Sequence, residues 1–293
     1  MFAQVSSAAT EEAAGGKVFG ELDIRPSWTT KAGSVGTEDS IEAGYKFNDK
    51  FSASYVQGIL TNLSSPNESS GGLNLLGDVG FFRAKVGDVA DLGSGVKMSY
   101  QARVYTPTYR PLSEAGMLTY MRSYFNFSKD VIPETLTVTF SEIPSLWVFD
   151  RAGKDGAANP TLENRVYLIA DITLAKGLSL SLPLFFVQTK FSEFEVGATN
   201  NAAWVFNLST WPELTYSVSD SLSVGLAYYS SNLVKSDLSE LTLGEGLEKG
   251  VVQTVFTTRF SQLSAPFPGA LSFLQTVTII LLGTSYVCRE ESN

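Results

Sequence analysis

VKMSYQARVY, residues 96–105, alternates between apolar and polar side chains without a break. Its even-numbered positions are apolar or aromatic, namely Val96, Met98, Tyr100, Ala102 and Val104, and between them lie Lys97, Ser99, Gln101, Arg103 and Tyr105. Successive side chains of a strand point to opposite faces, so this pattern predicts a β-strand with a different solvent on each face. Strands of soluble sandwiches also alternate, and the rest of the chain must therefore show which face meets water.

The same alternation recurs over residues 17–260, in about twelve segments near the roughly 9–11 residues that cross a bilayer as a tilted strand. Short connections, such as residues 48–50 and 175–177, take turns with longer loops, which is typical of outer-membrane barrels. Closing a single sheet of so many strands into a barrel removes its edges. We therefore expect an all-β fold, a transmembrane antiparallel up-and-down β-barrel of about 12 strands, with 12–14 compatible with the pattern.

The composition agrees with a membrane protein that lacks membrane-spanning helices. Only 17% of the 293 residues are charged, which is low against the roughly 25% of soluble domains. The longest apolar run, residues 277–283, is far shorter than the about 20 residues that a transmembrane helix needs. A barrel wall needs an apolar residue only at every second position, so it accounts for both observations.

Several classes of function are excluded by residue type. The net charge of −9 disfavours nucleic acid as a partner. The chain has no histidine, which excludes Ser-His catalysis and His-ligated zinc, and its single cysteine, Cys288, excludes a disulfide framework or a cysteine metal site. We therefore expect no enzyme activity, no catalytic residue, no metal site and no cofactor.

The strand pattern, the asymmetry of turns and loops and the lack of a helix resemble porin-type β-barrels of the Gram-negative outer membrane. This resemblance is architectural and covers residues 17–260. Residues 253–260, QTVFTTRF, are similar to the carboxy-terminal assembly signal of such barrels, although here residues 261–293 follow. The resemblance implies an outer-membrane location, contact with membrane lipid and passage of small hydrophilic solutes, and it is compatible with a homo-oligomer.

Three segments follow from this pattern. We expect residues 1–16 to form a flexible amino-terminal segment and residues 17–260 to form the barrel. Residues 261–293 form a carboxy-terminal segment that either adds a strand or is appended to the barrel.

If the apolar face meets lipid, the polar face lines the interior. The candidate basic pore-lining residues are then Arg83, Lys85, Lys97, Arg103, Arg122 and Arg165; the acidic ones are Glu21, Asp23, Glu42 and Asp171; the aromatic ones are Tyr105, Tyr120, Tyr124 and Tyr167. Three arginines occur near the middle of successive strands, so pairing could place them at one height as a basic ladder, with acidic residues on another wall. Opposed charges of this kind create a transverse field that filters solutes.

Two functions from different classes remain open on the sequence. The charged side chains either line a passive channel or neutralise one another and fill the interior. The second alternative is a structural or adhesive barrel whose lumen is closed and whose long loops bind a partner. A soluble, secreted β-rich protein is a third interpretation.

Overall fold

The computed structural model describes residues 17–29, 35–62, 74–242, 244 and 248–261, and this part of the chain is almost entirely β-structure. The segments predicted for residues 1–16 and 262–293 lie outside the described residues. The strands are β1 (Lys17–Ile24), β2 (Pro26–Thr29), β3 (Val35–Lys46), β4 (Phe51–Asn62), β5 (Asn74–Gly77), β6 (Gly80–Asp91), β7 (Val96–Thr106), β8 (Met117–Ile132), β9 (Leu136–Phe149), β10 (Gly153–Lys154), β11 (Ala157–Ala158), β12 (Pro160–Ala175), β13 (Leu178–Phe191), β14 (Trp204–Thr210), β15 (Glu213–Ser217), β16 (Leu222–Tyr229) and β17 (Val251–Ser261), with one short helix, α1 (Arg110–Glu114).

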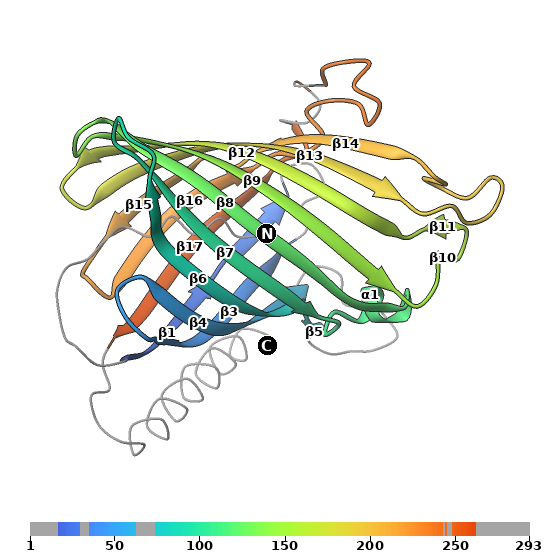
Figure 1. The fold of residues 1–293 in the computed structure, drawn as a ribbon, viewed down its shortest axis with the longest axis horizontal. Coiled ribbons are helices and arrows are strands. Elements are labelled where there is room, and N and C mark those ends of the chain that lie inside the picture. The colour runs from blue at the N-terminus through green and yellow to red at the C-terminus, as the bar shows by residue number, and fades with distance from the viewer. Residues whose placement is uncertain (1–16, 30–34, 63–73, 243, 245–247, 262–293) are drawn as a thin grey trace, which may run out of the picture.

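The sheet closes on itself as a barrel (Figure 1). Each strand pairs antiparallel with its neighbour in sequence, and β17 returns to pair with β1, where Arg259 faces Glu21. Three of the barrel strands are interrupted: β1 and β2 form one of them, β5 and β6 the second, and β14 and β15 the third. The two parts of each interrupted strand pair with the same neighbouring strand. Counted in this way, the described residues form a closed antiparallel barrel of twelve strands, as predicted.

The two faces of the wall differ as the alternation in residues 96–105 predicts. In β7, Gln101, Arg103 and Tyr105 are buried, whereas Val104 between them is 43% exposed. Large apolar side chains are exposed on strands all round the barrel, including Phe82, Met121, Phe140, Leu168, Leu184, Leu214, Leu226 and Phe256. A ring of exposed apolar side chains around buried polar ones is the arrangement of a barrel whose outer surface meets lipid.

Short turns that contain glycine join some of the strands. The turn after β6 uses glycine at Gly93 (φ +83°) and Gly95 (φ +75°), a left-handed backbone that costs glycine little. The predicted turn at residues 175–177 joins β12 to β13 and also contains a glycine of positive φ, Gly177. No helix in the described part of the chain is long and apolar enough to cross a membrane.

The structure departs from the expected strands at two places. The amino-terminal strand, expected to continue through Trp28, breaks at Arg25 between β1 and β2. On β9 the outer face is not uniformly apolar, because Glu142 is exposed between the buried Ser141 and Ile143. Glu142 therefore lies on the same outer wall as Phe140, which is a departure from the apolar pattern.

Because Gly44 on β3 has no side chain, the ring of Phe19 and the neighbouring strand β4 lie close to its backbone. A Cβ atom built at Gly44 would lie 2.5 Å from Phe19 Cζ, 2.6 Å from Ser54 Cβ and 2.8 Å from the carbonyl oxygen of Ala53. Gly44 is paired with both Phe19 and Ser54, so two of these contacts are with its immediate cross-strand partners. The wall at this point has no room for a side chain.

We expect Gly44→Ala to lower the free energy of unfolding by about 1–3 kcal/mol, because overpacking forces the neighbouring strands apart. The measurement is the urea midpoint of the refolded protein in detergent micelles. Gly87→Ala is the matched control, since its Cβ would meet nothing nearer than the carbonyl oxygen of Lys50, at 3.8 Å. Equal midpoints for the two variants would contradict the prediction.

Candidate functional site: the interior of the barrel

The interior carries a row of three arginines across successive strands. Arg83 on β6 is paired directly with Arg103 on β7, and Arg103 with Arg122 on β8. The strand registers therefore place the three arginines in one cross-strand row. Arg103 and Arg122 are 6% and 2% exposed, so two guanidinium groups are buried side by side.

Aromatic rings hold both buried guanidinium groups. The Arg103 Cζ atom lies 4.7 Å from the ring centroid of Phe81 and 4.4 Å from that of Tyr124. The Arg122 Cζ atom lies 5.1 Å from the ring centroid of Tyr105 and 4.8 Å from that of Tyr120. The negative faces of the rings attract the cations and partly replace the water that burial removes.

The hydroxyl of Tyr105 joins the two arginines. It accepts hydrogen bonds from Arg103 Nη1 at 3.4 Å and from Arg122 Nη1 at 3.3 Å, and it lies 3.4 Å from the Tyr124 hydroxyl. Three of the four predicted aromatic residues, Tyr105, Tyr120 and Tyr124, therefore contact the basic row directly. These hydrogen bonds and ring contacts hold the guanidinium groups in one geometry.

A row of aromatic rings lies two residues along the strands from the row of arginines. Phe81, Tyr105, Tyr120 and Trp147 are successive cross-strand partners on β6, β7, β8 and β9. The ring centroids of Tyr105 and Tyr120 are 3.7 Å apart, and those of Tyr120 and Trp147 are 4.0 Å apart. The row thus forms an aromatic surface beside the basic one, and Trp147 was not predicted from the sequence.

Carboxylates pair with part of the basic row. Glu163 on β12 accepts from Arg122 Nη2 at 3.1 Å and from Arg165 Nε at 2.5 Å. Glu42 forms an ion pair with Arg83. Glu42 was expected on another wall than the arginines, but only one strand, β4, lies between β3 and β6, and Glu42 reaches Arg83 across it.

A second charged cluster lies where the barrel closes. Arg25, at the break between β1 and β2, donates to Asp23 Oδ2 at 2.9 Å and to Glu213 Oε2 at 3.2 Å. Arg259 donates to Glu21 Oε2 at 3.0 Å. Carboxylates outnumber guanidinium groups in this cluster, whereas cations are in excess in the basic row.

The remaining predicted residues lie at the margins of these clusters. Lys85 is half-buried on β6, two residues along from Arg83. Lys97 is exposed at the start of β7, next to the short turn and away from the arginines. Asp171 is half-buried on β12, and Tyr167 on the same strand is buried with its ring centroid 4.4 Å from that of Phe185. The structure thus brings together Arg83, Arg103 and Arg122 but not Lys97.

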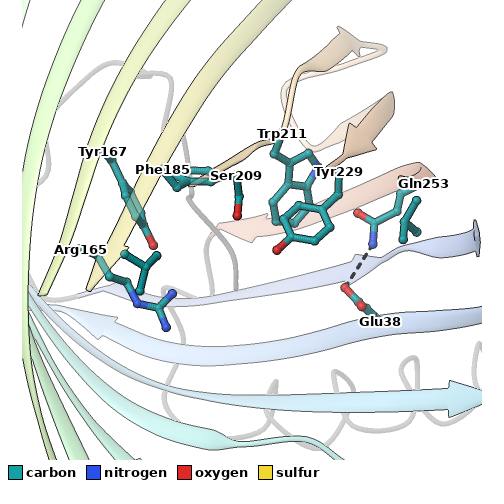
Figure 2. Close-up of a pocket in the computed structure, with 10 residues that line it drawn as sticks. Glu38, Arg165, Tyr167, Phe185, Ser209, Trp211, Tyr229 and Gln253 are labelled. Atoms are coloured by element: carbon teal, nitrogen blue, oxygen red, sulfur yellow. Dashed lines mark hydrogen bonds between the residues drawn. The ribbon is translucent and has the colours of Figure 1, made fainter. Parts of the chain in front are cut away.

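Two cavities open inside the barrel. One has a volume of about 300 Å³ and is lined by Tyr167, Phe185, Trp211, Tyr229 and Gln253 among others (Figure 2). The other, of about 150 Å³, is lined by acidic residues of the second cluster and again by Phe185 and Trp211. Phe185 and Trp211 border both cavities.

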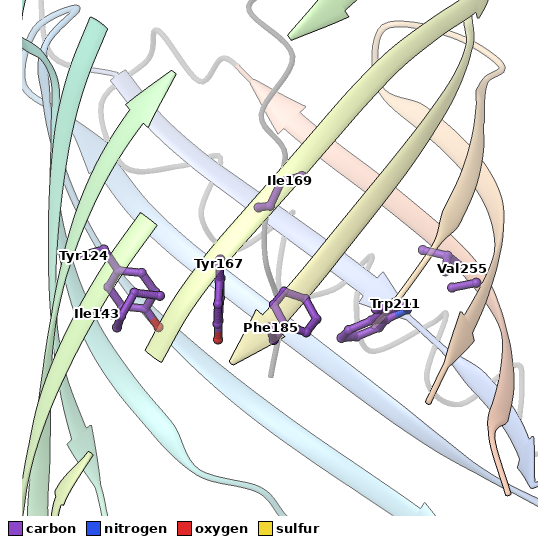
Figure 3. Packing of buried hydrophobic residues seen from close by; sticks show 8 residues of the cluster. Tyr124, Ile143, Tyr167, Ile169, Phe185, Trp211 and Val255 are labelled. Atoms are coloured by element: carbon purple, nitrogen blue, oxygen red, sulfur yellow. The ribbon is translucent and has the colours of Figure 1, made fainter. Parts of the chain in front are cut away.

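An apolar cluster reaches into the interior beside these cavities (Figure 3). Ile143, Ile169, Phe185, Trp211 and Val255 are all buried, with Ile143 fully so. The interior residues predicted from the sequence are charged residues and tyrosines, so these five apolar side chains were not among them. Their positions within each alternation were the available signal, because each shares the parity of a polar interior residue on its own strand.

No known family model and no curated protein matches the chain. Solved structures of similar fold include two at 10% sequence identity. The NanC porin covers 83% of this chain and 100% of its own length with a TM-score of 0.52, and an outer membrane channel from Pseudomonas putida F1 covers 88% and 100% with a TM-score of 0.54. The chain has the fold of an outer-membrane porin. The resemblance inferred from the strand pattern is therefore confirmed at the level of architecture.

The described residues offer no site for a metal ion, since no group of three or more acidic or cysteine side chains among them could hold one. The interior of this porin-like barrel presents fixed charges, aromatic faces and hydrogen-bonding groups.

Proposed function

We propose that the protein is a passive channel for small hydrophilic solutes in the outer membrane of a Gram-negative bacterium, and that it prefers anions. The observation that carries the proposal is Arg103. This side chain is 6% exposed, and among the described residues no carboxylate contacts it. A buried cation of this kind is costly unless a partner compensates it, and a passing anion can supply part of that compensation.

The charges around Arg103 support the same preference. Arg83, Lys85, Arg122 and Arg165 are its cationic neighbours along the wall, and Glu42 and Glu163 are carboxylates that form ion pairs with this row. The excess of positive charge here and of negative charge near Asp23 and Glu213 gives the interior a transverse field. Such a field favours small anions and dipolar solutes over cations at the basic wall.

Reconstitution of the full chain into a planar bilayer tests the proposal. We expect stepwise conductance in KCl and, under a KCl gradient, a reversal potential of the sign given by chloride passing more readily than potassium. Membranes that stay silent at voltages where porins conduct would overturn the channel function. Conductance with a reversal potential of the opposite sign would overturn the anion preference alone.

A second function is favoured by the depth of burial in the interior. Ile143 and Ser230 are fully buried and Arg122 is 2% exposed, values typical of a packed core. On this basis the alternative is a structural barrel whose lumen is filled and whose long loops bind a partner. It predicts silent bilayers together with a folded, heat-resistant barrel, so the same reconstitution separates the two functions.

A further inference from the structure

The larger of the two interior cavities has aromatic walls suited to a ring-shaped solute. Its volume is about 300 Å³, at the lower end of the range for ligand pockets, which suits a solute with a single ring. Tyr167 and Phe185 meet edge to face on one side, with ring centroids 4.4 Å apart, and Trp211 and Tyr229 do so on the other, at 5.7 Å. Figure 2 shows these four side chains around the same space.

Polar groups complete the lining of this cavity. Gln253 is 2% exposed and donates from Nε2 to Glu38 Oε2 at 3.1 Å. Its other amide atom, Oε1, is buried and has no hydrogen-bond partner among the described residues. Figure 2 shows the amide end of Gln253 directed toward the space between the rings. A buried acceptor without a donor is costly, and a ligand that brings a hydroxyl group removes that cost.

The polar groups are too many for a purely aromatic ligand. Besides Gln253, the lining includes Glu38, Arg165, Ser209 and the hydroxyl-bearing Tyr229. A ligand that matches aromatic faces and several hydrogen-bonding groups at once is a saturated ring with hydroxyl substituents, because its C–H groups face the rings and its hydroxyls reach the polar side chains.

We propose that this cavity binds a hexose-sized cyclic polyol, with Gln253 Oε1 accepting from one hydroxyl and Trp211 and Tyr229 contacting the ring. The inference deepens the proposed channel function and rests on it for the passage of the solute, although binding can be measured without conduction. Phe185 and Trp211 also border the smaller cavity, so the site lies next to it inside the barrel.

Binding is tested on the full chain refolded in detergent micelles, with glucose as the probe and intrinsic tryptophan fluorescence as the readout. The chain has four tryptophans, and the Trp211→Phe variant identifies the part of the signal that comes from the cavity. We expect a saturable change with glucose that Trp211→Phe removes. Sorbitol carries similar hydroxyl groups without a ring, and we expect it to give a much weaker change.

Gln253→Leu is expected to raise the half-saturating glucose concentration about five- to tenfold, the effect of one hydrogen bond to a buried acceptor. Gln57→Leu is the matched control, because the Gln57 amide is satisfied by Tyr55, Gly58 and Asp78 and lies outside the cavity. Circular dichroism shows whether each variant retains its β-structure.

The outcomes separate this inference from the channel function. If the protein conducts ions but glucose gives no saturable change, or if sorbitol binds as well as glucose, the polyol site is wrong and the channel stands. If bilayers are silent while glucose binding depends on Gln253, the site stands and the channel is wrong. Equal effects of Gln253→Leu and Gln57→Leu would also overturn the assignment.

Discussion

Arg103→Glu is expected to reverse the ion preference of the reconstituted protein. The substitution changes the charge at the centre of the basic row by two units, between Arg83 and Arg122, with which position 103 is paired. Charges within a few ångströms of a permeating ion change its energy by about 1–2 kcal/mol even in wet surroundings, so the anion-to-cation permeability ratio should fall about tenfold or more. The measurement is the reversal potential under a KCl gradient.

Lys97→Glu is the matched control for this prediction. It makes the same change of charge on the same strand and the same face, but at the exposed end of β7. We expect it to move the reversal potential much less, and Arg103→Gln to give an intermediate value. If Arg103→Glu folds and conducts with an unchanged reversal potential, Arg103 does not face the path of the ions.

Glu163→Leu is expected to have the largest effect on stability. The Glu163 carboxylate compensates two cations, Arg122 and Arg165, and its side chain is 7% exposed. Removing one partner from a buried ion pair leaves an uncompensated charge, which costs about 3–5 kcal/mol. We expect the urea midpoint in detergent micelles to fall accordingly, with a smaller loss for Glu163→Gln, which keeps an oxygen as hydrogen-bond acceptor.

Glu142→Leu provides the comparison on the neighbouring strand. Glu142 is exposed on the outer face of β9, where a leucine matches the apolar surroundings. We expect its stability to be unchanged or raised. A loss as large as that of Glu163→Leu would show that the result reflects the loss of any glutamate rather than the buried network.

Most of the fold could be predicted from the alternation of side chains and the spacing of turns. Whether a residue such as Arg103 or Val104 faces inward depends only on its parity within a strand, and parity can be read locally. The pairing of Arg83 with Arg103 was predictable for a related reason, because the short turn between β6 and β7 sets their register, whereas a longer connection with α1 separates β7 from β8. Long connections set no such register, and the break at Arg25 was not visible in the pattern.

The candidate site was less accessible to sequence reasoning. Glu163 and Trp147 share the parity of interior residues, but Glu163 contacts Arg122 and Trp147 contacts Tyr120 on another strand, β8, and a local pattern does not identify such contacts. The larger cavity brings Phe185 and Trp211, which lie on neighbouring parts of the sheet, together with Glu38 and Gln253 from segments distant in sequence. A contact of that kind depends on how the barrel closes.

The alternation in residues 96–105 and its repeats by themselves determined a barrel wall with an apolar outer face and the inward direction of the three arginines, since side-chain direction in a strand is a local property. Only the tertiary structure decided that Glu42 pairs with Arg83, that Glu163 joins Arg122 to Arg165, and that four aromatic rings and Gln253 enclose one cavity. The physical reason is that these contacts depend on the stagger and curvature of the closed sheet, which no single strand encodes.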